Sequence, residues 1–197
     1  MTAGQGYPTG RDYAAHLERL AATGKEMHGE AHLCARLQPP PARILDAGCG
    51  TGRVVAFLAT LGYDCVGTDL DSSMLEIARQ VPGVAWIEAD LVALDLAQHG
   101  VTEPFDLVVS AGNVVPLVQD PAAALNRMAA HLRPGGLLVA GFGLARTHLP
   151  TGAAVLALAD YDAWCAAAGL TLRQRFATWD GEPYADGPYA VSVFVRA

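Results

Sequence analysis

Two kinds of hydrophobic pattern alternate along most of the chain. Short apolar runs, typical of buried strands, lie at residues 43–47, 65–69, 84–87, 105–110 and 137–142. Between them, apolar residues recur every three or four positions, which indicates amphipathic helices. Strands that alternate with helices predict a mostly parallel sheet with helices on both faces. We therefore expect an α/β sandwich of three layers.

Helix start and stop signals refine this pattern. The expected helices run from residue 12 onward, then over 30–37, 54–61, 73–78, 121–132 and 160–168. Leu61 is assigned to the inner face of the third of these. Ser73 and Glu76 have the spacing of a capping box, which places a helix start at Ser73. The segment 133–136, Arg-Pro-Gly-Gly, is expected to be a turn before the fifth strand.

The last third of the chain follows a different pattern. Residues 170–178 and 189–196 each alternate apolar and polar side chains, which is typical of half-buried strands. The turn-forming segment 180–183 and the residues after it lie between them. We expect these two strands to form an antiparallel hairpin at the edge of the sheet.

Length and composition fit one compact domain. Of the 197 residues, 52% are apolar and 17% are charged, so a sizeable core is available. No apolar run approaches the ~20 residues of a membrane span. The N-terminal residues lack the basic and apolar regions of a signal peptide. The sequence therefore predicts a cytoplasmic protein with no membrane partner.

Charge and metal-ligand spacing exclude further classes. A formal net charge of -7 argues against a nucleic-acid partner, which requires a basic footprint. The four cysteines form no C-x-x-C pair, so neither a zinc site nor a redox pair is suggested. His28 and His32 are spaced as a helical pair but lack the HExxH pattern, and we interpret them as helix surface. No metal site is expected.

The most informative stretch joins the first strand to the next helix. Gly48, Gly50 and Gly52 follow an apolar run, and Asp69 lies 21 residues beyond Gly48, at the end of the second strand. Glycines let the backbone pass close to a ligand, and a strand-end acid can accept hydrogen bonds from ribose hydroxyls. The spacing differs from the G-x-G-x-x-G of dinucleotide-binding loops, since Arg53 stands where the last glycine would be. A P-loop also needs a lysine, and the only one in the chain is Lys25.

The D-A-G-C-G-T-G run over residues 46–52 resembles the first motif of class I S-adenosylmethionine (SAM)-dependent methyltransferases. Segments 105–109 and 132–136 are similar to motifs at the fourth and fifth strands of that family. The resemblance covers about residues 43–142. It implies a Rossmann-like fold with a seven-stranded, mostly parallel sheet whose last strand is antiparallel. It also implies SAM as cofactor and S-adenosylhomocysteine as product.

The resemblance implies a role for individual residues. The counterpart of Asp46 helps to orient the methionine end of SAM, that of Asp69 binds the ribose hydroxyls, and those of Asp90 and Leu91 hold the adenine. The expected cofactor-binding set is Asp46, Gly48, Gly50, Gly52, Asp69, Leu70, Asp90, Leu91 and Asn113.

Several residues have a structural interpretation beside the functional one. Asp90 could instead cap a turn, and Asn113 could form one. Asp106, at the start of an apolar strand, is interpreted as structural. Trp179 and Tyr184 could line an acceptor pocket or pack the hairpin, and we favour packing.

The acceptor side is less specified by sequence. Enzymes that methylate amino groups of DNA or glutamine carry Asn/Asp-Pro-Pro-Tyr/Phe after the fourth strand, whereas this chain has Asn-Val-Val-Pro at 113–116. We expect residues 1–38 to form a helical cap on a domain that covers 39–197. A lid would come from this cap and from the loop 144–159. Residues of these segments that could reach the site are His28, His32, His148, Tyr7 and Tyr13, and no sequence context selects one as catalytic base.

Three hypotheses follow. The first is methyl transfer from SAM to a small-molecule acceptor by in-line displacement. The second is a non-catalytic SAM-binding sensor or partner subunit. The third is a nicotinamide-dependent oxidoreductase, against which the glycine spacing counts. The sequence identifies neither the acceptor nor the oligomeric state.

Overall fold

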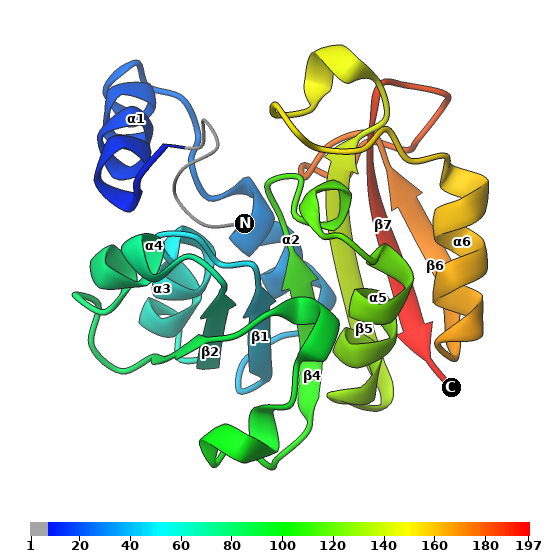
Figure 1. Ribbon diagram of the computed structural model, residues 1–197, viewed down its shortest axis with the longest axis horizontal. Helices are drawn as coiled ribbons and strands as arrows, with labels where there is room; N and C mark the ends of the chain where they lie inside the picture. The colour runs from blue at the N-terminus through cyan, green and yellow to red at the C-terminus, as the bar shows by residue number, and fades with distance from the viewer. Residues whose placement is uncertain (1–7) are drawn as a thin grey trace.

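The computed structural model describes residues 8–197, and within them seven strands form one sheet (Figure 1). The sheet order is β3-β2-β1-β4-β5-β7-β6. All pairs from β3 to β5 are parallel, while β7 is antiparallel to β5 and to β6. The strands are β1 Arg43–Ala47, β2 Asp64–Asp69, β3 Ala85–Glu88, β4 Phe105–Ser110, β5 Leu132–Gly143, β6 Leu170–Phe176 and β7 Tyr189–Arg196. The predicted fold class and the terminal hairpin are confirmed.

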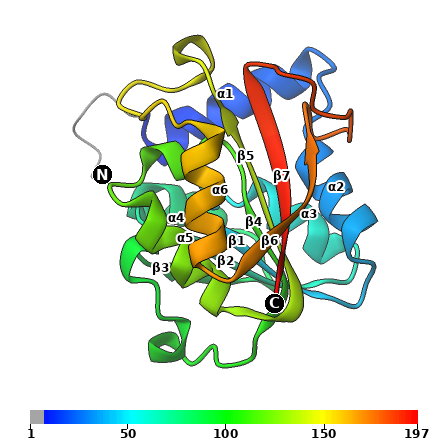
Figure 2. The same cartoon turned by 90° about the vertical axis from the view of Figure 1, so that its right-hand side faces the viewer.

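Helices cover both faces of this sheet (Figure 2). One core packs α5 and α6 against the sheet, and the other packs α2 and α3 against the opposite face. The helices are α1 Gly10–Ala22, α2 Gly29–Leu37, α3 Arg53–Thr60, α4 Ser72–Ala78, α5 Pro121–Ala130 and α6 Leu158–Ala167. No helix within residues 8–197 is long and apolar enough to cross a membrane.

The two helices before β1 differ in how they join the body. α2 buries Ala31, Leu33 and Cys34 in the core, so it belongs to the helix layer. α1 packs mainly against α4, and Gly10 is its one buried residue. A Cβ at Gly10 would lie 2.0 Å from the Ser73 carbonyl oxygen, which explains the glycine at this crossing. The division at residue 38 stays a prediction, and Tyr7 lies outside the described residues.

Two helix predictions were wrong in detail. Leu61 is the C-cap residue of α3 and is 43% exposed, because the helix ends at Thr60 before Leu61 can turn inward. α4 begins at Ser72 and not at Ser73. Its cap is Asp71, whose carboxylate accepts a hydrogen bond from the Ser73 backbone N–H. An aspartate one residue before the helix served as cap in place of the predicted box.

Strand β5 begins earlier than predicted, because it includes the Arg-Pro-Gly-Gly segment. Leu132 pairs with Phe105, and the register then shifts before Leu137 pairs with Leu107. A Cβ at Gly136 would lie 2.9 Å from the Arg133 carbonyl oxygen, so glycine permits this tight irregularity. The predicted turn is therefore an irregular segment inside the strand.

Candidate active site

A cavity of about 640 Å³ opens beyond the carboxyl ends of the parallel strands. Residues at the ends of β1, β2 and β3 form one side, which we call the strand wall and define as Asp46, Gly48, Gly50, Asp69, Leu70, Asp90 and Leu91. Loops after β4 and β5 form the other side, which we call the loop wall and define as Val114, Leu117, Val118 and Pro150. α1 lies over the same end of the sheet (Figure 1). Such an edge is where open α/β sheets bind their ligands.

The glycine turn after β1 is anchored to β2. The backbone N–H groups of Gly48 and Cys49 both donate to the Thr68 carbonyl at 2.8 Å. Gly48 has a φ of 83°, and a Cβ there would lie 2.5 Å from Val114. At Gly50, by contrast, an added Cβ would make only an ordinary contact with the Tyr13 ring. The turn therefore presents its backbone to the cavity at a position that the sheet fixes.

Gly52 is the member of the predicted cofactor set that does not line the cavity. It caps α3 with a φ of 82°, and an added Cβ would lie 2.3 Å from the Trp86 ring. Gly67 in β2 lies under the same ring, at 2.5 Å from an added Cβ. The structure therefore places Gly52 in the packing between α3 and β3.

Asp69 is held by backbone donors at the rim of the glycine turn. Its Oδ2 accepts a hydrogen bond from Gly50 N–H at 2.7 Å, and its Oδ1 accepts one from Asp71 N–H at 2.9 Å. Burial raises the pKa of this carboxyl above its usual value, while those two hydrogen bonds oppose the shift. Each oxygen keeps a second lone pair, and Asp69 lines the cavity. Since Asp71 caps α4, Asp69 does not have that role.

Asp46 is the most deeply buried acid of the site. It is 2% exposed, and its Oδ2 has no hydrogen-bond partner among the described residues. Burial raises its pKa to about 7, with Arg53 opposing the shift and Asp69 adding to it. A buried carboxylate oxygen without a partner is costly, so this atom is suited to a cationic or hydrogen-bond-donating ligand group.

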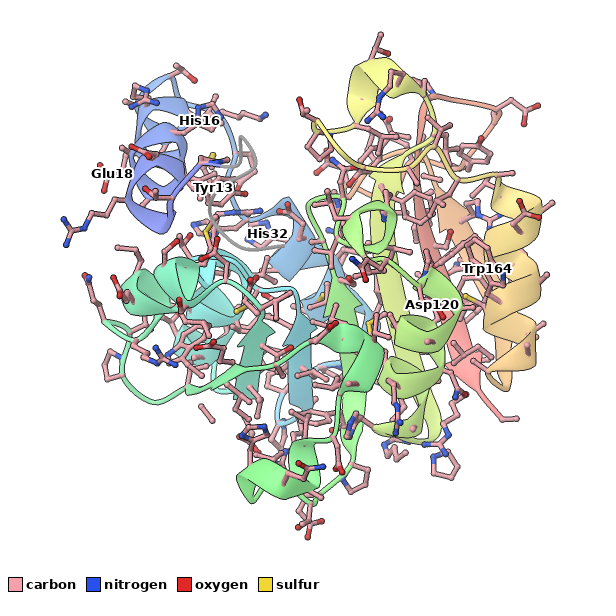
Figure 3. All side chains as sticks on the ribbon, in the orientation of Figure 1. Tyr13, His16, Glu18, His32, Asp120 and Trp164 are labelled. Carbon is pink, nitrogen blue, oxygen red and sulfur yellow. The ribbon has the colours of Figure 1, made fainter. Side chains whose placement is uncertain are left out.

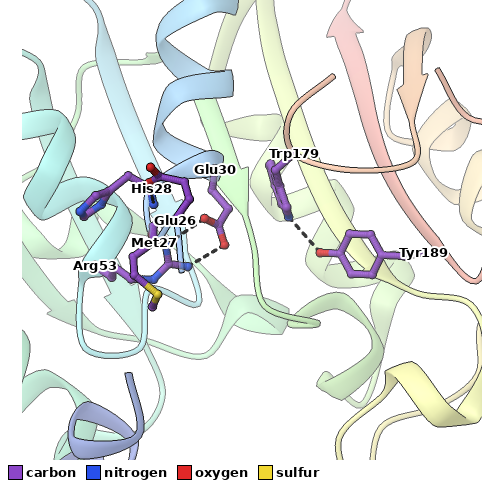
Figure 4. A network of polar contacts seen from close by, with 7 residues as sticks. All are labelled: Glu26, Met27, His28, Glu30, Arg53, Trp179 and Tyr189. Carbon is purple, nitrogen blue, oxygen red and sulfur yellow. Dashed lines mark hydrogen bonds and ion pairs between the residues drawn. The ribbon is translucent and has the colours of Figure 1, made fainter. Parts of the chain in front are cut away.

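Arg53 and Glu30 form a half-buried ion pair that sequence analysis missed (Figure 4). The guanidinium makes two hydrogen bonds to the Glu30 carboxylate, at 2.8 and 2.6 Å, and a third to the Met27 carbonyl. This pair ties α2 to the start of α3, and Arg53 also lines the cavity. Its sequence signal was the arginine directly after the last glycine, which had served only to exclude a dinucleotide loop.

Asp90 and Leu91 lie at the exit of β3. The Oδ1 atom of Asp90 accepts a hydrogen bond from Val92 N–H at 3.0 Å and caps a short 3-10 helix, Leu91–Ala93. The capping interpretation is therefore confirmed, and Oδ2 stays available in an exposed residue. Leu91 is buried in the core, whereas Leu70 is 45% exposed at the cavity edge.

The loop wall is fixed by hydrogen bonds between distant segments. Asn113 adopts a φ of 66°, and its Oδ1 accepts a hydrogen bond from Gly143 N–H at 2.7 Å. Ala154 N–H donates to the Pro116 carbonyl at 2.8 Å. The Arg146 guanidinium donates to the carbonyls of Pro150 and Ala153 at 2.8 and 2.7 Å. The side-chain oxygen of Asn113 therefore has a structural role, although the residue lines the cavity.

The helix α1 contributes Tyr13 and Leu17 to the cavity lining. Tyr13 lies on the side of α1 that faces the sheet, and Glu18 lies on the other side (Figure 3). Burial is the main cause that raises the pKa of the Tyr13 phenol, so it stays protonated at neutral pH. The expected lid segments both reach the cavity, α1 through these two residues and the later loop through Pro150.

Other candidates lie outside the cavity lining. His28 stacks on Phe57 with ring centroids 4.1 Å apart, and His32 meets the same ring edge-on at 5.3 Å. Trp179 packs over Gly141 and donates a hydrogen bond to the Tyr189 hydroxyl at 3.0 Å (Figure 4), which confirms the packing interpretation for it. No group of three metal-ligating side chains gathers within the described part of the chain.

The structural role assigned to Asp106 is also confirmed. Its carboxylate accepts hydrogen bonds from Arg43 N–H at 2.7 Å and from the Arg133 guanidinium at 2.6 Å. Those two hydrogen bonds lower its pKa, although partial burial opposes the shift. Asp106 is the second residue of β4, at the end of the strand that lies away from the cavity.

Comparison with known proteins assigns the family. A sequence profile described as "Methyltransferase domain" matches residues 44–136. The crystal structure of a TehB-like SAM-dependent methyltransferase from Corynebacterium glutamicum is 35% identical, with a TM-score of 0.82 over 95% of this chain and 98% of that one. The chain belongs to the class I SAM-dependent methyltransferases. Its methyl donor is accordingly SAM.

Curated relatives of this methyltransferase act on different acceptors. Trans-aconitate 2-methyltransferase of Methylobacterium nodulans is 31% identical over 168 residues, which are 72% of this chain and 63% of the relative. The tRNA 5-carboxymethoxyuridine methyltransferase of Escherichia coli K12 is 32% identical over 109 residues, which are 53% of this chain and 41% of the relative. The chain thus spans less than two thirds of the length of these relatives. The fold also matches SAM-bound CalS10, an amino pentose methyltransferase from Micromonospora echinaspora, with a TM-score of 0.76, 23% identity and coverage of 99% and 100%.

Proposed function

We propose that this methyltransferase transfers a methyl group from SAM to a small-molecule acceptor bound in the cavity. The observation that carries the proposal is one cavity with two unlike walls. Its volume of about 640 Å³ suits small ligands, which occupy pockets of roughly 300–1,000 Å³. The strand wall offers the groups that a nucleoside and an amino acid need, and the loop wall leaves an apolar surface opposite them.

The residues of the strand wall fit SAM in chemistry. Asp69 has free lone pairs for two ribose hydroxyls, and the unpaired Oδ2 of Asp46 suits the ammonium at the methionine end. We assign Asp90 Oδ2 to the adenine amino group and Leu70 and Leu91 to the faces of the ring, since all three residues line the cavity. Gly48 and Gly50 let the backbone approach the ligand. We assign Gly52 and the Asn113 oxygen to supporting the site and not to ligand contact.

The chain's own contribution to the chemistry is alignment and exclusion of water. A lone pair of the acceptor bonds the activated methyl carbon, the carbon–sulfur electron pair stays on sulfur, and a proton lost from a neutral acceptor passes to solvent. Tyr13 and Leu17 on α1 and Pro150 on the loop wall cover the cavity. Because the Tyr13 phenol stays protonated, it is a hydrogen-bond donor here and not a base.

The acceptor size is supported by two further observations. The formal charge of -7 is unfavourable for a polyanionic acceptor such as RNA. At the carboxyl end of the sheet, α1 and the loops after β4 and β5 border the cavity, and the described chain places no further domain there. Methylation of trans-aconitate by a relative is consistent with a small acceptor.

Calorimetric titration with SAM and S-adenosylhomocysteine tests the cofactor half of the proposal, with NAD(H) as the unrelated control. A broad panel of small acceptors then tests transfer, with S-adenosylhomocysteine formation as the readout. Tight SAM binding and acceptor-dependent product support the proposal. SAM binding without turnover across the panel would favour the non-catalytic sensor, and no binding by folded protein would reject both.

A further inference from the structure

The charge distribution inside the cavity differs from that of a site built for an anion. Its lining carries four carboxylates, Asp46, Asp69, Asp71 and Asp90, against one guanidinium, Arg53. Arg53 is the only basic side chain among the described lining residues, and it is already held by Glu30 and the Met27 carbonyl. The charge of Arg53 is therefore already offset by Glu30 before any acceptor enters the cavity.

The loop wall lies on the side of the cavity opposite the residues assigned to SAM, and this side is left for the acceptor. In the order β3-β2-β1-β4-β5, the strand wall occupies the ends of β3, β2 and β1. The loop wall follows β4 and β5, and its four side chains are apolar, while Asn113 and Gln119, which line the same side, are polar but uncharged. Its backbone polar groups are used between the loops, as in the hydrogen bonds to the carbonyls of Pro116 and Pro150. An acceptor bound on this side of the cavity therefore meets mainly apolar side chains, carried by loops that hydrogen bonds hold together.

From these two observations we propose that the acceptor is an uncharged molecule with an apolar body, and that the cavity discriminates against carboxylates. This inference rests on the proposed function, since it concerns the acceptor of the same reaction. A carboxylate placed against the loop wall would lose its water without gaining a cation from the protein, and it would face the acids of the strand wall. The site would in this respect differ from that of a relative that methylates trans-aconitate.

The test uses pairs of probes that share a nucleophile and differ by a carboxylate: propanethiol with mercaptopropionate, catechol with dihydroxybenzoate, and aniline with aminobenzoate. Binding of each probe to the protein–S-adenosylhomocysteine complex is measured by calorimetry or ligand-observed NMR, separately from turnover. We expect the uncharged member to bind roughly 10- to 100-fold more tightly in the pairs that bind. Equal binding, tighter binding of the acids, or no binding of any probe would overturn the inference.

Turnover with the same probes keeps the two proposals apart. If no probe yields product but the neutral members bind selectively, the proposed function is weakened and the inference on charge stands. If the acids are methylated in preference, the proposed function stands and the inference fails.

A charge-introducing variant sharpens the result. Gln119 is exposed and lines the cavity next to Val118, so Gln119→Arg adds a cation beside the loop wall without disturbing the core. We expect this variant to bind the carboxylated probes roughly tenfold more tightly than the wild type does, and so to lower the affinity ratio of uncharged to carboxylated probe in each pair. Gln80→Arg, the same substitution after the end of α4 and outside the cavity lining, is the matched control and should leave the preference unchanged. An unchanged preference in Gln119→Arg would contradict a role for the lining charge.

Discussion

The two walls of the cavity are built from different parts of the chain. On the strand wall, glycine backbone and carboxylates are locked to the sheet, as Gly48 N–H is to Thr68 and Asp69 to Gly50. On the loop wall, apolar side chains sit on loops that are joined to each other, as Pro116 is to Ala154. A change on the strand wall therefore disturbs the fold, whereas side chains of the loop wall can vary on an intact frame. A family that keeps one donor and changes acceptors can use this division.

The largest expected effect compares two glycines with similar backbone angles. Gly52 has a φ of 82° and lies under the Trp86 ring, while Gly112 has a φ of 74° and nothing within 4 Å of an added Cβ. Gly52→Ala should lower the free energy of unfolding by roughly 2–4 kcal/mol, from left-handed strain plus overlap. Gly112→Ala should cost only the strain, roughly 1–2 kcal/mol. Urea denaturation of both variants measures this, and equal losses of stability would contradict the assigned overlap between Gly52 and the Trp86 ring.

Next comes Asp69→Asn, which removes the charge of the proposed ribose ligand. SAM affinity should weaken by roughly 10- to 100-fold, because hydrogen bonds to a charged group are each worth ~1.5–3 kcal/mol. One backbone donor, from Gly50 or Asp71, would then face the new amide nitrogen, so apo stability should fall by about 1 kcal/mol. Asp120→Asn is the control, since Asp120 caps α5 outside the cavity lining, asparagine also caps a helix, and SAM affinity should stay the same. Calorimetry that finds Asp69→Asn within threefold of wild type would reject the ribose assignment.

The pH dependence of SAM binding tests Asp46. Its pKa of about 7 lies above the unfolded value of about 3.9, so the native state retains a proton that the unfolded state loses. Apo stability from this group is therefore present below about pH 4 and is lost as the pH rises through about 7. SAM needs the carboxylate, so its affinity should fall roughly tenfold per pH unit below 7. Titrations at two pH values measure this. Asp46→Asn should remove the dependence, and a wild-type affinity that does not change with pH would contradict the assignment.

The smallest expected effect concerns Asp90 on the outer rim of the strand wall. Asp90→Asn keeps the cap of the 3-10 helix but removes the charge from the oxygen proposed for adenine. SAM affinity should weaken by roughly 2- to 10-fold, since the residue is exposed and asparagine still offers an acceptor. The same titration on Asp95→Asn, an exposed cap of the next 3-10 helix outside the cavity lining, gives the baseline. If the two variants bind SAM with equal affinity, Asp90 serves only as the cap of the 3-10 helix.

The sequence by itself determined the order of elements and the end of the sheet where the cavity opens. Continuous apolar runs predicted β1 and β4 with their observed bounds, because strands inside a parallel sheet are buried on both faces, and alternation predicted the bounds of β7. Sequence patterns failed where local signals compete. Asp71 and Ser73, two residues apart, can both cap α4, and Asp71 does so. The residues predicted to form a turn before β5 instead lie within the strand that pairs with β4. These outcomes depend on which backbone groups a neighbouring strand or helix leaves unpaired.

Only the tertiary structure decided which residues share a surface. It brought Tyr13 to the cavity and turned Gly52 toward Trp86, although the motif around Gly52 is continuous in sequence. It also joined Arg53 to Glu30 across 23 positions, and so paired the one basic side chain of the described cavity lining. Sequence spacing fixes the face of an element on which a side chain lies. The contacts of that face depend on how helices and loops pack around the sheet. This packing sets the charge and the shape of the cavity.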